Sequence, residues 1–412
     1  MKKKDKKTVL FSGPVKNNNQ TINPPESDTS DEIPEYNDYY LTVSVRFRTA
    51  KIVCVFALCI FILSSMLIFG ESMTYENARY IMRDLGQILS EDSSEPASQI
   101  TFDVDGEMDY AVFRGSLVVC GVSGVDIFSP SGTKKLTDNT SFISPVAVTS
   151  EKYCIVYSLG AYNLSIYNTV ARVYDMKFEF PIYDVAVSDD GYIAVMTQSN
   201  EYKCVVYMYN SDFKQIGTYN KVNYPCAVDI CDKTNDLSIA TFGTHNGKYI
   251  TKIDSYALNS NEPVYSVDIE GRMPFDISVM LEGNLAILTQ DSLVFLTNEG
   301  DTVAHARFDG TLTDYQFSEN SVSLLVNNGI SRIHSYDCNG SMIHTFDAEN
   351  AIDIHYTDTV VLARSNSSLT AIPTSVGEPY SIELDHGARR LISHDGYLYV
   401  CYPDKITSIS LK

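Results

Sequence analysis

The chain has 412 residues, a formal net charge of −21 at pH 7, no tryptophan and 28 tyrosines. So acidic a surface repels nucleic acids and anionic lipid headgroups, which excludes a nucleic-acid partner. The charge is unevenly distributed: residues 1–51 hold 9 basic and 7 acidic side chains, whereas the rest of the chain holds 22 basic and 45 acidic ones.

Residues 1–51 are predicted to be a disordered cytoplasmic tail. The segment opens with five lysines among its first seven residues and continues through Asn, Pro, Ser and Asp. It contains few large apolar side chains, so it cannot bury a core. Near its end, residues 41–48 alternate apolar and polar side chains and predict a short interfacial stretch that leads into a membrane.

Residues 52–70 form an uninterrupted run of 19 residues without charge. A helix of that length rises about 28 Å, close to the thickness of the hydrocarbon core of a bilayer. Arg46, Arg48 and Lys51 precede the run, and the first charges after it are acidic. The positive-inside rule therefore predicts a transmembrane helix in the cell membrane, with residues 1–51 in the cytoplasm and the C-terminal domain extracellular. A buried core helix of a soluble protein is the alternative.

Residues 71–97 are predicted to form a membrane-proximal helix and a linker. Apolar side chains recur at helical spacing along one stripe between residues 73 and 90. They are Tyr75, Ala78, Met82, Leu85 and Leu89. The stripe predicts docking on the following domain or pairing with a second copy, and the Ser-, Glu- and Pro-containing residues 91–98 predict the linker.

From residue 98 onward, helical periodicity disappears, and short β-branched and tyrosine-rich runs alternate with Asp, Gly and Asn turns. The clearest unit covers residues 182–219 and indicates four strands joined by tight turns, which is the unit of a β-propeller blade. Seven other segments repeat its first hairpin. The eight hairpin turns are predicted near residues 115, 151, 190, 234, 283, 319, 357 and 395.

The end of the chain predicts how the ring closes. After the last hairpin, residues 404–411 supply only one further strand, whereas an unpaired strand-like segment occurs at residues 99–104. An open ring would expose strand edges, so residues 99–104 are predicted to complete the last blade. The predicted fold is therefore all-β: residues 98–412 form an eight-bladed β-propeller, with seven blades as the alternative, preceded by one transmembrane helix and a short membrane-proximal helix.

The nine cysteines do not indicate a disulfide framework, because an odd number of them is scattered singly along the chain. Cys226 and Cys231 are the closest pair beyond the apolar run, but their spacing along an extended strand places them on roughly opposite faces. An extracellular domain without bridges fits a bacterial cell surface better than an animal one.

The outer domain carries no recognised catalytic, cofactor-binding or metal-binding motif. Its seven histidines are isolated, and it contains no Cys-x-x-Cys pair, nucleophile elbow or phosphate-binding loop. Residues 103–107 resemble the start of a calcium loop but lack the later ligands, so a strand-ending turn is the preferred interpretation. We therefore predict no catalytic residue, no cofactor and no metal site.

The hairpin Val-Ala-Val-Ser-Asp-Asp-Gly-Tyr-Ile-Ala-Val at residues 185–195 is similar to those of tryptophan-aspartate-repeat propellers, although the Gly-His and Trp-Asp marks of that family are missing. With its basic tail and single apolar run, the whole chain resembles a family of uncharacterised bacterial single-pass membrane proteins with a propeller-like extracytoplasmic domain. The resemblance implies a membrane-anchored propeller and carries no known activity.

The predicted function is a binding or scaffolding module at the bacterial cell surface, with a protein or an envelope polymer bound on one propeller face. The first alternative is an envelope hydrolase or lyase with its site at the mouth of the central channel, and the second is a surface sensor. A channel mouth lined by two or more carboxylates with a His or Arg favours the enzyme, whereas Ser, Asn and apolar groups there disfavour it.

Overall fold

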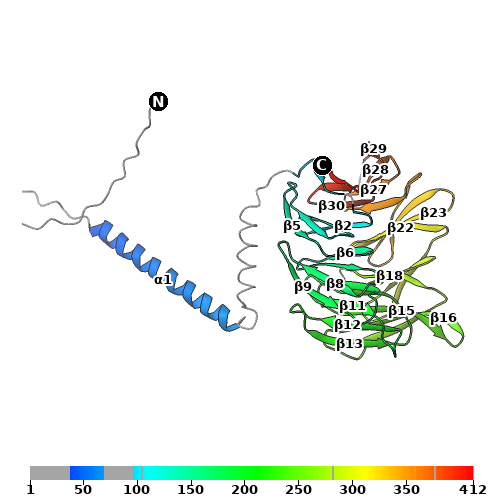
Figure 1. Ribbon diagram of the computed structural model, residues 1–412, viewed down its shortest axis with the longest axis horizontal. Helices are drawn as coiled ribbons and strands as arrows, with labels where there is room; N and C mark the ends of the chain where they lie inside the picture. The colour runs from blue at the N-terminus through cyan, green and yellow to red at the C-terminus, as the bar shows by residue number, and fades with distance from the viewer. Residues whose placement is uncertain are drawn as a thin grey trace, which may run out of the picture. The chain divides into compact units, whose positions relative to one another are not determined.

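In a computed structural model, the described residues are 38–68, 96–103, 105–280, 283–357, 359–374 and 377–411. The chain divides into two units, one with the helix α1 (Asp38–Ile68) and one with all the strands (Figure 1). The first part of the predicted tail, up to residue 37, and the predicted membrane-proximal helix lie outside the described residues.

The helix α1 includes most of the uncharged run. It begins well before residue 52, so residues 41–48 form its first turns rather than a separate stretch that leads into it. Helix propagation explains this difference, because each added residue gains one backbone hydrogen bond once the helix has nucleated. No helix within the described residues combines the length and the apolar character needed to cross a bilayer.

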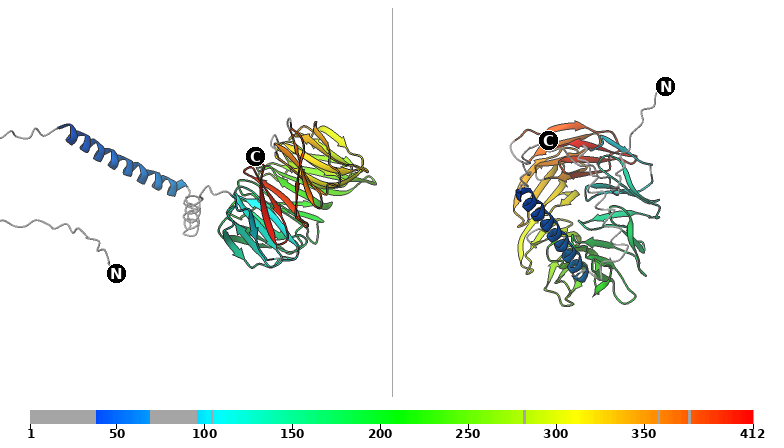
Figure 2. Two further views of the ribbon diagram at one scale, coloured as in Figure 1. Left: turned by 90° about the horizontal axis from the view of Figure 1, so that it is seen from above. Right: turned by 90° about the vertical axis from the view of Figure 1, so that its left-hand side faces the viewer.

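The strands form eight antiparallel sheets of four strands, and each sheet is one blade of a propeller (Figure 2). The inner strands are β2 (Met108–Phe113), β6 (Pro145–Thr149), β10 (Asp184–Val187), β14 (Tyr224–Ile230), β18 (Pro274–Val279), β22 (Thr311–Phe317), β26 (Asp353–Tyr356) and β30 (Arg390–His394). The second strands are β3 (Ser116–Gly121), β7 (Cys154–Ser158), β11 (Ile193–Thr197), β15 (Leu237–His245), β19 (Leu285–Thr289), β23 (Ser321–Asn327), β27 (Val360–Arg364) and β31 (Tyr397–Cys401).

The third strands are β4 (Val125–Phe128), β8 (Asn163–Tyr167), β12 (Cys204–Tyr209), β16 (Lys248–Tyr256), β20 (Ser292–Leu296), β24 (Ser331–Asp337), β28 (Ser368–Pro373) and β32 (Lys405–Ser410). The outer strands are β5 (Lys134–Asp138), β9 (Arg172–Lys177), β13 (Gln215–Lys221), β17 (Tyr265–Glu270), β21 (Thr302–Arg307), β25 (Met342–Asp347), β29 (Tyr380–Glu383) and β1 (Gln99–Thr101). We number the blades along the chain, from blade 1 (β2 to β5) to blade 8 (β30 to β32 with β1).

The core of the propeller lies between neighbouring blades, where the faces of two sheets pack together. Between blades 1 and 2, Phe113 and Val118 pack with Val156 and Tyr167. The second strands are mostly buried, as in β11, whereas the outer strands are mostly exposed or partly buried, as in β21. Tyr110 and Tyr167 are among the largest fully buried side chains, so tyrosines supply the bulky inter-blade packing in a chain without tryptophan.

The ring closes as predicted, through the strand β1 at the start of the domain. β1 pairs antiparallel with β32, with Gln99 opposite Thr407 and Ile100 opposite Ile406. It thereby becomes the outer strand of blade 8. The inner strands of blades 1 and 8 also contact each other, so the ring is continuous at the junction. The prediction of eight blades is confirmed, and the alternative of seven is wrong.

The predicted hairpin turns join the inner and second strands. In blade 8 the turn holds Asp395 and Gly396 at positive φ, and in blade 3 Gly191 has a φ of 85°. Glycine adopts such angles without a steric penalty, which explains its place in these turns. All nine cysteines are free, including the pair Cys226 and Cys231.

Candidate functional site

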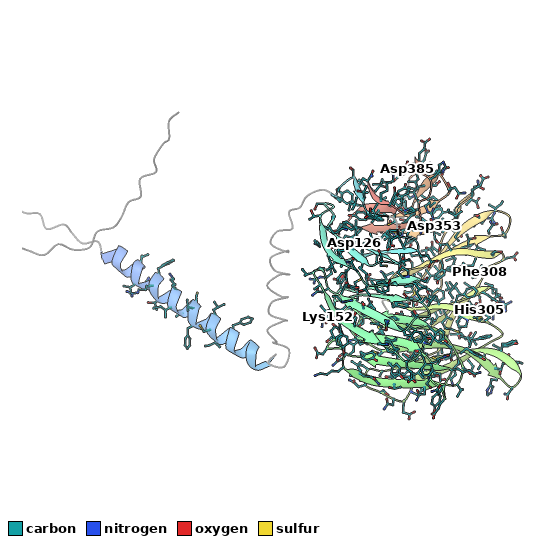
Figure 3. The ribbon with its side chains drawn as sticks, in the orientation of Figure 1. Asp126, Lys152, His305, Phe308, Asp353 and Asp385 are labelled. Atoms are coloured by element: carbon teal, nitrogen blue, oxygen red, sulfur yellow. The ribbon has the colours of Figure 1, made fainter. Side chains whose placement is uncertain are left out.

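The propeller has two faces that carry different loops. The hairpin face holds the turns between inner and second strands, such as that around Lys152, and the turns between third and outer strands. The connection face holds the loops between second and third strands and the connections to the next blade, such as that at Phe308. Figure 3 labels Lys152 and Phe308 on opposite sides of the propeller.

Exposed apolar side chains are concentrated on the connection face. Of the sixteen large apolar side chains exposed in the described propeller, ten lie on this face, five lie on outer strands, and only Val264 lies in a turn of the hairpin face. The ten are Ile143, Leu159, Tyr162, Val222, Tyr224, Tyr249, Met273, Phe275, Ile330 and Ile352. Ile143 is 80% exposed and Val222 is 71% exposed. Apolar groups gathered on one face indicate an interaction surface.

The described chain enters the propeller at the hairpin face. The backbone N–H of Ala97 donates to the carbonyl oxygen of Pro130 over 2.9 Å, and Pro130 lies in the turn between the third and outer strands of blade 1. β1 then runs to the connection face, where the N–H of Phe102 donates to the carbonyl oxygen of Asp404 over 3.0 Å. The connection face is therefore opposite the point of entry.

A groove with a volume of about 720 Å³ lies between the outer strand of blade 2 and the last two strands of blade 3. Its lining includes three carboxylates, Asp175, Glu179 and Glu201, and one basic side chain, Lys177. Glu179 belongs to the connection between the two blades, and Glu201 belongs to the loop between the second and third strands of blade 3. The groove is thus acidic at its connection-face end, and it extends between the two blades to Tyr209 and Gln215, which flank a turn of the hairpin face.

Much of the remaining lining of the groove is aromatic. The aromatic residues are Tyr174, Phe178, Phe180, Tyr202, Tyr207 and Tyr209. Phe178 is buried, and its ring centre lies 6.0 Å from that of Tyr207 in a stacked arrangement. Burial raises the pKa of Tyr209 to about 12, so its hydroxyl stays neutral at physiological pH. Aromatic faces beside carboxylates suit a cationic group.

Exposed apolar residues flank the groove on both sides. Toward blade 2, the N–H of Phe178 donates to the carbonyl oxygen of Tyr162 over 2.8 Å, which joins the exposed Tyr162 loop to the groove lining. Toward blade 4, Lys203 Nζ lies 4.0 Å from the ring centre of Tyr224, and Lys203 directly follows the groove residue Tyr202. A ligand longer than the groove would therefore contact apolar surface on either side.

Carboxylates also gather around the connection-face end of the central channel, on the inner strands. They are Asp109, Asp184, Asp276, Asp314 and Asp353, whereas Asp229 lies one residue from the hairpin-face end of β14. Several of them join neighbouring blades: the N–H of Ala147 donates to Asp109 Oδ2 over 3.0 Å. Likewise, the N–H of Val228 donates to Asp184 Oδ2 over 2.9 Å. These carboxyls are therefore structural links between blades as well as polar groups of the channel mouth.

Burial perturbs the protonation of several inner-strand carboxyls. Burial raises the pKa of Asp184 and of Asp229 to about 7, and the nearby charge of Asp276 acts in the same direction. Burial also raises the pKa of Asp276 and of Asp314. Carboxyls that titrate near neutral pH are the groups from which general acids and bases are drawn.

Arginines balance part of this charge. Arg390 forms an ion pair with Asp109 across the junction of blades 8 and 1, and Arg364 pairs with Asp353, which Figure 3 labels. One buried oxygen of Asp353 has no hydrogen-bond partner. Several carboxylates with an arginine at the channel mouth are the arrangement that favours the enzyme hypothesis.

A histidine and a serine also meet between blades 7 and 8. His355 Nε2 lies 2.8 Å from Ser393 Oγ on the neighbouring inner strand. Burial, reinforced by the charge of Arg390, lowers the pKa of His355 to about 4. So weakly basic a histidine is a poor general base at neutral pH, and the pair is better explained as a hydrogen bond between blades.

The sequence predicted no site residues and did not single out the carboxylates of the channel mouth. Their signal was present, because an Asp precedes an apolar strand residue in several units, as in Tyr-Asp-Val-Ala-Val and Phe-Asp-Ile-Ser-Val. The groove had no such signal, since Glu179 and Glu201 come from different loops. Among the described residues, no group of three or more His, Cys, Asp or Glu side chains has the arrangement of a metal site.

Several solved structures share the fold at low identity. Sqt1 from Saccharomyces cerevisiae is similar with a TM-score of 0.59 and 10% identity, over 77% of this chain and 100% of that one. Chaetomium thermophilum Sqt1, bound to the N-terminus of the ribosomal protein L10, has a TM-score of 0.56 and 10% identity, over 77% of this chain and 100% of that one. BamB from Moraxella catarrhalis has a TM-score of 0.52 and 11% identity, over 76% of this chain and 98% of that one. At these identities, the likeness shows the β-propeller fold alone.

The sequence itself matches a family rather than a characterised protein. No curated protein matches the chain. The sequence pattern of a family of unknown function, DUF5711, matches residues 91–411. This range includes the whole propeller and most of the chain. The protein therefore belongs to the DUF5711 family of unknown function.

Proposed function

We propose that this protein is a binding or scaffolding module, held at a bacterial membrane by residues 52–70, with a polypeptide partner bound on the connection face. The gathering of ten exposed apolar side chains on that face carries the proposal. The propeller fold is compatible with it, since one structure of Sqt1, which shares the fold, is bound to the N-terminus of a ribosomal protein.

A photo-crosslinking experiment in intact cells tests the binding face. Benzoylphenylalanine replaces Tyr224 or Phe275 on the connection face, or Val264 on the hairpin face, all of which are exposed. We expect a discrete protein adduct after irradiation at the first two positions and none at Val264. Adducts at all three positions alike, or none at either connection-face position, would contradict the proposal.

The proposed topology has its own test. It is based on the uncharged run and the basic residues that precede it. Protease added to intact, wall-stripped cells should release a stable fragment that begins near residues 91–98, identified by immunoblotting and N-terminal sequencing. A propeller that survives attached in intact cells, and is released only after lysis, would refute an extracellular orientation.

An envelope hydrolase or lyase is the second candidate function. The observation that favours it is the channel mouth, where buried Asp184 has a pKa of about 7 and Arg390 pairs with Asp109. Against it, Asp184 accepts a backbone hydrogen bond from the next blade, which is a structural use of this group. Binding therefore ranks first.

The two candidates are separated by a direct assay. Purified full-length protein is incubated with peptidoglycan or wall polysaccharide, and released reducing ends are measured. An enzyme should release them, and Asp184→Asn should reduce the rate about 100-fold or more. No release by the unaltered protein, or release by Asp184→Asn at the rate of the unaltered protein, would rule out catalysis at the channel mouth.

A further inference from the structure

We propose that the groove between blades 2 and 3 binds an extended polypeptide segment in which Arg or Lys is flanked by large apolar side chains. The inference rests on the proposed function, because it names the chemistry of a partner on the connection face. Its basis is the combination of three features described above: the acidic lining, the aromatic residues and the apolar loops on either side.

The lining of the groove selects for positive charge. The lining includes two carboxylates from different loops, Glu179 and Glu201, and one lysine, Lys177. The third carboxylate, Asp175, already accepts a hydrogen bond from Ser165 and pairs with Arg172, so it adds little free charge. The rings of Tyr202, Tyr207 and Phe178 add π-faces that attract a cation. The same face already shows such a contact, between Lys203 and Tyr224 at 4.0 Å. An arginine suits this environment well, since its planar group both stacks on aromatic rings and pairs with carboxylates.

The surroundings of the groove select for apolar neighbours of that cation. In an extended segment, residues i and i+2 share a face and lie about 7 Å apart. Side chains two positions on either side of an inserted Arg would therefore reach the exposed loops at Leu159 and Tyr162 or at Val222 and Tyr224. Burial of these apolar groups would supply affinity, and the carboxylates would supply selectivity.

Other occupants fit less well. Both propeller faces carry more acidic than basic loop residues, so a second copy, an anionic lipid surface or an anionic wall polymer would be repelled. The described chain joins the propeller at the hairpin face, through Ala97 and Pro130, opposite the face that holds Glu179 and Glu201. A neutral glycan would stack on the aromatic rings but would leave the carboxylates without a counter-charge.

The test measures the binding of defined peptides to the full-length protein in detergent micelles. The first fluorescein-labelled peptide repeats Leu-Ser-Arg-Ser-Phe, the second replaces Arg by Glu, and the third replaces Leu and Phe by Ser. Fluorescence anisotropy should give the first peptide an affinity at least about tenfold higher than that of either other peptide. Equal affinity for the Arg and Glu peptides, or tighter binding of a neutral oligosaccharide, would overturn the proposal.

Matched variants locate the binding. Glu179→Gln combined with Glu201→Gln removes two groove charges, and Glu299→Gln combined with Asp301→Asn removes two exposed charges from the hairpin face. The first pair should weaken binding of the Arg peptide about tenfold, whereas the second should leave it within about twofold. If both double variants lose the same affinity for the Arg peptide and keep their thermal stability, the attraction is non-specific and the groove is not the binding site.

The outcomes also separate this inference from the proposed function. If the peptides are not distinguished while adducts at Tyr224 persist in cells, the partner binds elsewhere on the connection face and the groove assignment is wrong. If the peptides are distinguished but Tyr224 and Phe275 form no adducts in cells, the groove assignment stands and the proposed cellular role is wrong.

Discussion

Closure of the ring by β1 can be tested with a single substitution, Ile100→Ala. The side chain of Ile100 is 5% exposed and packs with Tyr110, Phe128 and Ile406, so it joins blade 8 to blade 1. Replacement of a buried isoleucine by alanine costs about 2–5 kcal/mol, the sum of lost transfer energy and the cavity left behind. β1 is a short outer strand that can partly relax, so we expect about 3 kcal/mol.

This energy converts into a measurable shift in melting temperature. Unfolding entropy amounts to about 2.1 cal/mol/K per residue, or about 0.65 kcal/mol/K for the roughly 310 residues of the propeller. A loss of about 3 kcal/mol should therefore lower Tm by about 5 °C. The same chemical change at Ile143, which is 80% exposed, should shift Tm by less than about 1 °C.

Differential scanning calorimetry of the full-length protein and the two alanine variants provides the comparison. Both variants lose the same atoms, so any difference between them reflects the burial of Ile100. If Ile100→Ala melts within about 1 °C of Ile143→Ala, the side chain of Ile100 contributes nothing to the fold in solution and the ring is not closed by β1.

Two further outcomes follow from the carboxyls and the turns. Raising the pH from about 5 to about 8 should lower Tm, because folded Asp184 and Asp229 have pKa values of about 7 against 3.8 when unfolded, so the folded state alone keeps these protons. The expected loss in the free energy of unfolding is about 1–2 kcal/mol per carboxyl. The double variant Asp184→Asn with Asp229→Asn should flatten the dependence of this free energy on pH, measured by urea titration at each pH. The same pH dependence in the double variant and the unaltered protein would contradict the reasoning. Gly191→Ala should destabilise blade 3 by about 1–2 kcal/mol or more, because φ is 85° and the added Cβ would lie 2.8 Å from the ring of Tyr153. Equal stability of this variant would show that the turn adopts another conformation.

The sequence predicted the blades well because the signals that define them are local. Alternating strands and turns such as that at Asp189 to Gly191 act over a few residues, so the hairpins and the closing strand were all placed. The groove depends on Glu179 and Glu201, which meet only after two blades have packed side by side. The start of α1 at Asp38 also escaped prediction, since apolar alternation in residues 41–48 masks a helix that extends from the following run.

The pairing of Ile100 with Ile406 also sets the order in which the domain can form. About 300 residues separate the two strands, and at about 5–20 residues per second a ribosome needs roughly 15–60 s to make them. Throughout that time, β1 has no strand to pair with, and blade 1 lacks its neighbour on one side. The earlier blades can pack in sequence while the chain is made, but the last few strands decide whether the ring is complete. A chain interrupted before β32 would leave both edges open, which makes unfinished copies easy for proteases to recognise.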